Sequence, residues 1–198
     1  MANSALAKVG ADQAAKLGVS GTPLTPMGAE RAGNADGSIP AWTGGITQPP
    51  AGYKIGMHHP DPLASDKPLM TITAKNYKDY ADQLTVGQMA MFEKYPEWRM
   101  AVYPTRRSAS NPARTYEMTI KHALTGEIVG DGDGVANVAE GIPFPIPKTG
   151  VEVFWNHVLR YRADAATRQI GQAPVTASGS YTMVKFKANQ KYLLMPIE

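Results

Sequence analysis

Hydrophobic positions recur with helical spacing in several stretches of the chain, most clearly after Thr149. Thr149 with Glu152 forms the capping-box pattern that begins a helix there. The residues that fall on one side of this helix are Val151, Phe154, Trp155, Val158, Leu159 and Arg162. Breaks at Gly or Pro separate the other stretches with such spacing. The spacing predicts helices over residues 75–84, 85–95, 114–124 and 149–162. Ala and Lys residues favour a further short helix over residues 8–17.

Two of these helices depend on additional signals. Thr85 and Gln88 fit a second capping box, and a proline ends the element that they begin. Residues 114–124 satisfy both helical and alternating spacing, because Tyr116 and Ile120 belong to both patterns. We favour the helix in that stretch, and a strand is the alternative.

Alternation of side chains predicts strands in the second half of the chain. Trp98, Met100 and Val102 occupy every second position of a short segment, as in a half-buried strand. Residues 167–176 and 180–195 also favour strands, and the second of these contains the apolar run Tyr192-Leu-Leu-Met195. We expect turns at Gly130-Asp-Gly-Asp-Gly134, Ser178-Gly179 and Ala188-Asn189-Gln190.

The first 68 residues have almost no periodicity and many Gly and Pro residues. We therefore expect residues 1–68 to form a loop-rich segment, tied down by Trp42 and Tyr53, that wraps a folded body over residues 69–198. At 198 residues, the whole chain suits a single domain or the N-terminal portion of one. The elements together predict an α+β fold.

Composition narrows the function classes. Hydrophobic residues make up 43% of the chain and charged residues 19%, which is typical of a folded protein. The net charge is +3 and the basic residues are scattered along the chain as a whole, so we predict no nucleic-acid partner. The lack of cysteine excludes disulfides, thiolate nucleophiles and iron–sulfur clusters. No apolar run approaches the roughly 20 residues that span a bilayer.

Two short motifs offer metal-ligand chemistry, and we predict no metal or other cofactor at either. His58-His59-Pro60-Asp61 supplies imidazole and carboxylate ligands, but adjacent side chains point in different directions, so a surface loop is the better interpretation. The segment Gly130–Gly134 has no acidic residue at the twelfth position of a calcium loop and no Lys of a phosphate-binding loop. We interpret it as a tight turn.

No motif supports catalysis, so we predict that the chain is not an enzyme. The nucleophile-elbow pattern is missing, and sequence cannot place two carboxylates at catalytic separation. In the helix after Thr149, Glu152, Asn156 and Arg160 share a second face, with the acid near the positive end of the helix dipole. We expect a structural role for that row.

Residues 141–162 read G-I-P-F-P-I-P-K-T-G-V-E-V-F-W-N-H-V-L-R-Y-R, and this segment resembles the bacterial domain-of-unknown-function family 1329, described as outer-membrane-lipoprotein-sorting-like. The agreement continues upstream and covers nearly the whole chain. It includes Leu24-Thr-Pro-Met-Gly-Ala-Glu30, Ala32-Gly-Asn-Ala-Asp-Gly-Ser-Ile-Pro-Ala-Trp-Thr-Gly-Gly45, His58-His-Pro-Asp-Pro62 and Lys94-Tyr-Pro96.

The resemblance implies a protein exported to the periplasm of a Gram-negative bacterium, with a signal peptide that the given chain does not contain. It also implies a lipoprotein-carrier-like fold, in which helices pack on a curved antiparallel sheet. Family members are about twice this length, so we expect an incomplete sheet. Because an unpaired sheet edge invites self-association, we expect a homodimer through that edge.

The first functional hypothesis is a non-enzymatic periplasmic carrier that binds a lipid or another hydrophobic molecule, as an accessory to a transporter of the resistance-nodulation-division class. The alternative is an interaction scaffold that docks a transporter or an outer-membrane component, and an envelope lipid hydrolase comes third. Packing in the protein core is the competing role for each candidate groove residue. These candidates are Phe154, Trp155, Val158, Tyr181 and Met183.

Overall fold

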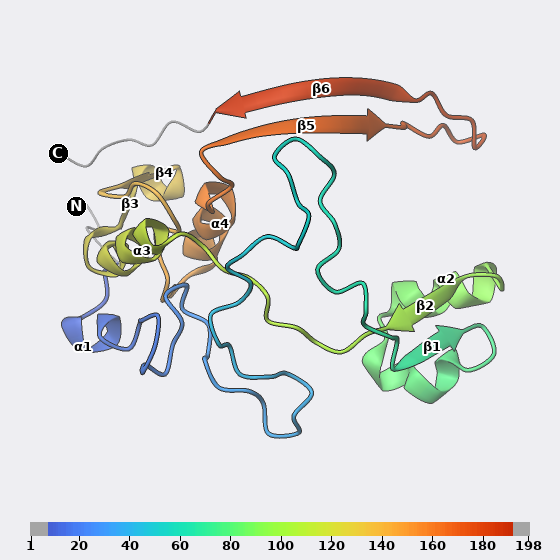
Figure 1. The fold of residues 1–198 in the computed structure, drawn as a ribbon, viewed down its shortest axis with the longest axis horizontal. Coiled ribbons are helices and arrows are strands. Elements are labelled where there is room, and N and C mark those ends of the chain that lie inside the picture. Colours follow the sequence, from blue (N-terminus) through green and yellow to red (C-terminus); the bar gives the residue numbers. More distant parts are fainter. Residues whose placement is uncertain (1–7, 192–198) are drawn as a thin grey trace. The chain divides into compact units, whose positions relative to one another are not determined.

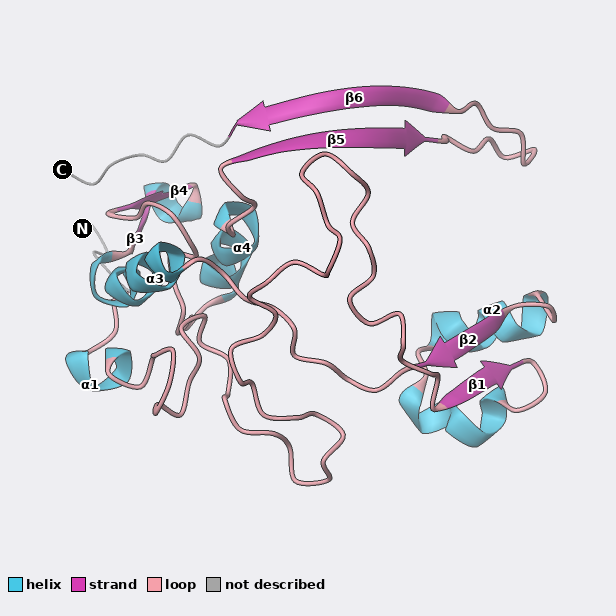
Figure 2. Ribbon diagram, viewed as in Figure 1, coloured by secondary structure: helices cyan, strands magenta, loops and turns pink. Residues whose placement is uncertain are grey.

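The computed structural model describes residues 8–191, which separate into two compact units. One unit combines the described residues up to Arg31 with those from Asn111 onward, and the other is Ala32–Ser110. Both contain helices and short antiparallel strands, so the mixed α+β prediction is confirmed (Figures 1 and 2). The strands described form three separate two-stranded sheets. One curved sheet with a lipoprotein-carrier-like fold therefore stays a prediction.

The unit Ala32–Ser110 has a small core between one hairpin and two helices. Strands β1 (Met70–Thr73) and β2 (Arg99–Val102) pair antiparallel, and they are accompanied by the 3₁₀ helix η1 (Tyr77–Gln83) and the helix α2 (Val86–Lys94). The predicted strand over residues 98–103 is thus confirmed. Strand β1 was not predicted, because four residues are too few to show alternation.

Aromatic rings fill this core. Phe92 is fully buried, and its ring centroid lies 5.5 Å from that of Tyr77 and 4.3 Å from that of Trp98. Tyr77, Tyr80 and Leu84 of the predicted helical face over 75–84 do point inward, but the segment is 3₁₀ rather than α-helical and is kinked at Tyr80, where φ is −119°. Helix α2 begins at the predicted capping box, in which Thr85 and Gln88 bond each other's backbone N–H.

The loop between residues 32 and 69 contains no helix or strand, as the composition predicts. Trp42 anchors it: the indole is buried and its Nε1–H donates to the Ala109 carbonyl at 3.0 Å. Ser110 also donates to the Ile46 carbonyl, which ties the loop to the same stretch. The sequence-based expectation of an anchoring tryptophan is confirmed.

The other unit contains the remaining elements. It starts with the short helix α1 (Ala11–Ala14), inside the predicted range, and continues with α3 (Ala113–Thr125), where helix rather than strand is confirmed. The Gly130–Gly134 turn is confirmed as the link of a hairpin between β3 (Glu127–Val129) and β4 (Gly134–Ala136), with the 3₁₀ turn η2 (Gly130–Gly132) at its tip. Helix α4 (Gly150–Leu159) and the hairpin of β5 (Ala165–Gln172) and β6 (Val184–Lys191) follow.

One turn prediction in this unit is wrong. Ala188-Asn189-Gln190 lies inside β6, where all three residues pair with β5, because cross-strand hydrogen bonds override the weak local turn preference of Asn. The turn at Ser178-Gly179 is confirmed, with Gly179 at φ +84°. The predicted strand residues 192–195 lie outside the described part of the chain.

A buried proline-rich segment holds this unit together. We call residues 140–147 the proline strap; residues 140–145 are all buried, although none of them belongs to a helix or a strand. Pro143 and Pro145 have no N–H, so prolines remove two of the six donors that the buried residues 140–145 would have to satisfy. The strap can therefore cross a core without a neighbouring strand.

His122 of α3 satisfies part of the strap backbone. Its Nε2 accepts from the Ala139 N–H at 2.9 Å, so the proton resides on Nδ1, which donates to the Ile142 carbonyl at 3.1 Å. The side chain is only 1% exposed. Burial lowers the pKa of His122, against the opposing effect of the Ile142 bond, and the nearby Lys121 lowers it further. The imidazole is neutral in the folded protein.

Gly28 marks a close approach to the strap. Its φ is +83°, and a Cβ built there would lie 1.6 Å from the Pro145 carbonyl oxygen. That distance is far inside van der Waals contact with a backbone atom, which cannot move without shifting the strap. Only glycine fits at this position.

We expect Gly28→Ala to destabilise this unit by more than about 3 kcal/mol, because strain and a backbone clash add. Gly21→Ala is the matched control: Gly21 also has positive φ, at +68°, but a Cβ added there would have nothing within 4 Å. The control should lose only about 1 kcal/mol. Urea unfolding followed by circular dichroism measures both, and equal losses would contradict the close-approach argument.

We expect stability to fall toward acid because of His122. The folded pKa lies below the unfolded value of about 6.5, so this contribution is complete above that value and is lost as pH falls toward the folded pKa. Protonation would place an N–H at Nε2 against the Ala139 N–H. Wild type should therefore lose more stability between about pH 7.5 and about pH 5.5 than His122→Gln does.

His157→Gln is the control for this pH effect, because His157 is exposed on α4. It should keep the wild-type pH dependence. If the stability of His122→Gln falls with pH as steeply as that of wild type, other groups cause the acid sensitivity.

Candidate functional site

Helix α4 is held from its polar side. Glu152 is only 1% exposed, and its carboxylate accepts from the Lys148 N–H, while the Thr149 hydroxyl accepts from the Glu152 N–H at 3.3 Å. The predicted capping pair is present, but the carboxylate reaches the residue before the N-cap rather than the N-cap itself. A buried acid therefore fixes the start of this helix.

Asn156, one turn further along, clamps the strap. Its Oδ1 accepts from the Phe144 N–H at 2.8 Å and its Nδ2 donates to the Phe144 carbonyl at 2.7 Å, so one amide replaces a strand neighbour. The Trp155 indole N–H donates to the Gly132 carbonyl at 2.9 Å, which links α4 to the turn of the β3–β4 hairpin. These bonds set the rotation of α4 about its axis.

The opposite side of α4 is apolar and exposed. With about 100° per residue, Val151, Phe154 and Val158 lie across the helix from Glu152 and Asn156. Phe154 is 59% exposed, Val151 43% and Val158 38%, and we call these three residues the α4 apolar surface. The Trp155 ring borders it, with its centroid 5.8 Å from that of Phe154. A contiguous exposed apolar surface is typical of a binding site.

The structure therefore divides the predicted groove residues into two groups. Phe154, Trp155 and Val158 lie together on α4. Tyr181 and Met183 lie near the free end of the β5–β6 hairpin, roughly 25 to 33 Å along the strand from its base. Core packing, the competing role, is wrong for all except the half-buried Trp155, because Tyr181 is 65% exposed and Met183 51%. Ligand binding by these five residues stays a prediction.

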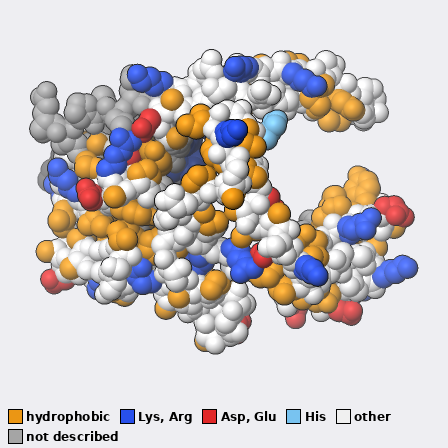
Figure 3. Space-filling model, in the orientation of Figure 1, with side chains coloured by type: hydrophobic (Ala, Val, Ile, Leu, Met, Phe, Trp, Pro, Cys, Tyr) orange, Lys and Arg blue, Asp and Glu red, His pale blue; other side chains and the backbone are white. Residues whose placement is uncertain are grey.

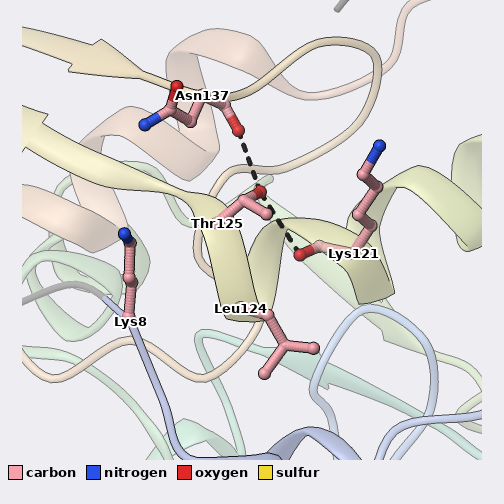
Figure 4. A pocket seen from close by; sticks show the side chains of 5 residues that line it. All are labelled: Lys8, Lys121, Leu124, Thr125 and Asn137. Carbon is pink, nitrogen blue, oxygen red and sulfur yellow. Dashed lines mark hydrogen bonds between the residues drawn. The ribbon is translucent and has the colours of Figure 1, made fainter.

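A shallow pocket of about 200 Å³ lies at the end of α3. It is lined by Lys8, Lys121, Leu124, Thr125 and Asn137 (Figure 4). Lys8 pairs with Glu127, and the Thr125 hydroxyl is bonded to backbone carbonyls of Lys121 and Asn137. The polar ends of the Lys121 and Asn137 side chains point in different directions, so they do not converge on one ligand atom (Figure 4).

His58 and His59 lie in an exposed loop, as predicted for that motif, and the His59 ring contacts Tyr53 edge-on at 5.5 Å between centroids. Within residues 8–191, no group of three or more His, Asp or Glu side chains could hold a metal ion. In the same range, no helix is long and apolar enough to cross a membrane.

Fold and site together define an α+β protein with an outward apolar helix surface. The chain belongs to the family described as a protein of unknown function (DUF1329), whose model matches residues 71–195, and the resemblance carried by its motifs is confirmed. It is also 47% identical, over 188 residues, to the uncharacterized protein PA3922 of Pseudomonas aeruginosa. That match covers 94% of this chain and 41% of the relative, so the chain spans about two-fifths of its length. No solved structure matches.

We expect Asn156→Ala to destabilise the unit by about 2–4 kcal/mol, because it leaves a buried N–H and a buried carbonyl of Phe144 without partners. The Phe144 amide should also exchange its hydrogen faster, which NMR measures directly. His157→Ala, an exposed neighbour on the same helix, should change stability by less than about 0.5 kcal/mol. Unchanged Phe144 protection in Asn156→Ala would contradict the clamp.

Proposed function

We propose that this chain is a non-enzymatic binding protein that carries a lipid-like or other hydrophobic molecule in the periplasm. The α4 apolar surface is the observation that supports this proposal best. A helix of a globular domain normally buries its apolar face, whereas α4 buries the Glu152 carboxylate, half-buries the Asn156 amide and turns Phe154 and Val158 outward.

The bonding of α4 supports a stable site rather than a loose helix. Asn156 bonds the strap and Glu152 bonds the Lys148 N–H just after it, and these bonds fix the rotation of α4, so the apolar surface is held outward. The surface is also uncharged, because Glu152 is the only charged residue between Gly150 and Leu159 and it lies on the buried side. An uncharged apolar surface fits a neutral hydrocarbon group better than a polar ligand.

The periplasmic location and a role beside a transporter of the resistance-nodulation-division class rest on the family resemblance alone. Catalysis is not part of the proposal, because the Glu152, Trp155 and Asn156 side chains of α4 are engaged in backbone bonds rather than paired as acid, base and nucleophile. The interaction scaffold remains the alternative.

We expect the chain to bind N-phenyl-1-naphthylamine, an apolar fluorescent probe, at the α4 apolar surface. Phe154→Ser combined with Val158→Ser should weaken probe binding at least about tenfold, because each change removes roughly 1 kcal/mol or more of apolar contact. Ile55→Ser is the matched control, since Ile55 is 98% exposed in the other unit. Probe fluorescence titration measures all three proteins.

Native mass spectrometry of protein purified without detergent provides the second readout. A lipid that copurifies with wild type and is lost from the Phe154→Ser/Val158→Ser variant supports the carrier. Probe binding that the Ile55→Ser control loses equally, or an empty wild-type protein that binds no probe, would contradict it and favour the scaffold.

A further inference from the structure

The β5–β6 hairpin carries a charge distribution unlike the rest of the chain. Residues 165–191 contain four cationic side chains, Arg168, Lys185, Lys187 and Lys191, and no Asp or Glu. The hairpin thus has a charge of +4, whereas the whole chain has +3, which leaves −1 for all other residues. The scattered distribution expected from the whole chain therefore does not hold for this element.

The pairing register places the lysines on one face. Lys185 is opposite Gly171 and Lys187 is opposite Gln169, and Lys191 follows on the same side, since alternate residues of a strand share a face. The other face carries Ile170, Val184 and Phe186 together with the fourth cation, Arg168. The lysine face has no acidic neighbour within the hairpin, so its charge is not compensated locally.

The lysine face becomes apolar toward the free end of the hairpin. Met183 belongs to this face, because its sulfur lies 3.3 Å from the position that a Cβ on Gly171 would occupy. Tyr181 pairs with Val175 across the end, and these two side chains are 65% and 68% exposed. Figure 3 shows hydrophobic atoms at the far end of the hairpin and cationic side chains further along it.

The free end is an ordered turn. The Thr176 N–H donates to the Ser180 carbonyl at 2.9 Å and the Gly179 N–H donates to the Thr176 carbonyl at 2.9 Å. No charged residue lies between Gln172 and Lys185. An uncharged turn with exposed Tyr, Val and Met side chains can therefore enter an apolar environment without burying a charge.

We propose that the free end of the β5–β6 hairpin docks on an anionic lipid bilayer. Tyr181 and Met183 enter the interfacial zone, where tyrosine is favoured because its ring is apolar and its hydroxyl is polar. Lys185 and Lys187 lie next on the same face and contact the anionic headgroups. This inference rests on the hairpin alone, so it stands or falls separately from ligand binding at α4.

Charge favours a bilayer over a second copy of the chain at β6. In a symmetric antiparallel pair of two β6 strands, opposite residues must share a face. In the central registers, Lys187 lies opposite Lys187 of the second copy, or Lys185 lies opposite Lys187 or Lys191 of the second copy. Like charges that face each other destabilise a strand pair. An anionic surface accepts all three lysines at once.

Vesicle sedimentation with the 198-residue chain tests the docking. The chain should bind vesicles of equal parts phosphatidylglycerol and phosphatidylcholine and should not bind pure phosphatidylcholine, and added salt should weaken the binding. Lys185→Gln combined with Lys187→Gln should weaken partitioning about 25-fold, since each lysine near an anionic surface contributes roughly fivefold. The control combines Lys75→Gln with Lys78→Gln, at two exposed lysines of the other unit, and it should change vesicle partitioning by less than about twofold.

A single cysteine reports insertion, because the chain has none of its own. An environment-sensitive fluorophore on Ala177→Cys, in the exposed turn, should brighten with the anionic vesicles, while the same fluorophore on Ala51→Cys should not. Tyr181→Ser with Met183→Ser should remove the brightening, with circular dichroism confirming that the variant is folded.

Three results would overturn the proposal. The first is vesicle binding that does not depend on lipid charge, or vesicle binding that the Lys75/Lys78 variant loses as much as the Lys185/Lys187 variant does. The second is equal affinity for a short DNA duplex, which would assign the lysine face to a polyanion. The third is a dimer in sedimentation together with no vesicle binding, which would assign the hairpin to a second copy.

Discussion

A run of six buried residues without a neighbouring strand must find hydrogen bonds for its backbone elsewhere, and the proline strap depends on this constraint. Prolines remove donors, and the two side chains His122 and Asn156 bond the Ala139 N–H, the Ile142 carbonyl and both backbone groups of Phe144. The strap can then lie between α3 and α4, with Gly28 close against it. Removing a side-chain partner exposes the strap to the full desolvation penalty of its backbone.

The orientation of α4 follows from the same requirement. Because Asn156 must face the strap and Glu152 must face the Lys148 N–H next to it, the helix turns its polar side inward, and the residues across the helix axis face outward. The apolar surface of Val151, Phe154 and Val158 is therefore a geometric consequence of how the strap is satisfied. One helix thus turns polar side chains toward the protein interior and apolar side chains toward solvent, the reverse of the usual arrangement.

Local signals in the sequence were sufficient for elements that local chemistry determines. The capping residues Thr85 and Thr149 placed the starts of α2 and α4, and helical spacing identified α3 although a strand was the alternative. What could not be predicted depends on tertiary partners. Amphipathic spacing in α4 indicates an apolar face but not whether that face is covered, and His122 gives no local sign that it bridges a distant backbone. The lysine face of β6 becomes visible only with the register of the hairpin.

The two exposed apolar surfaces differ in the charge around them, and this difference separates what each can bind. At α4 the only charged residue of the helix is buried on the far side, so transfer of a neutral hydrocarbon group onto Phe154 and Val158 disturbs no ion. At the hairpin, Tyr181 and Met183 continue directly into Lys185 and Lys187 on one face, so apolar contact and charge contact occur together. A neutral molecule uses only the first kind of surface, whereas an anionic interface with an apolar interior uses the second fully. Charge placement, more than hydrophobic area, is therefore the basis on which we propose different partners for the two surfaces.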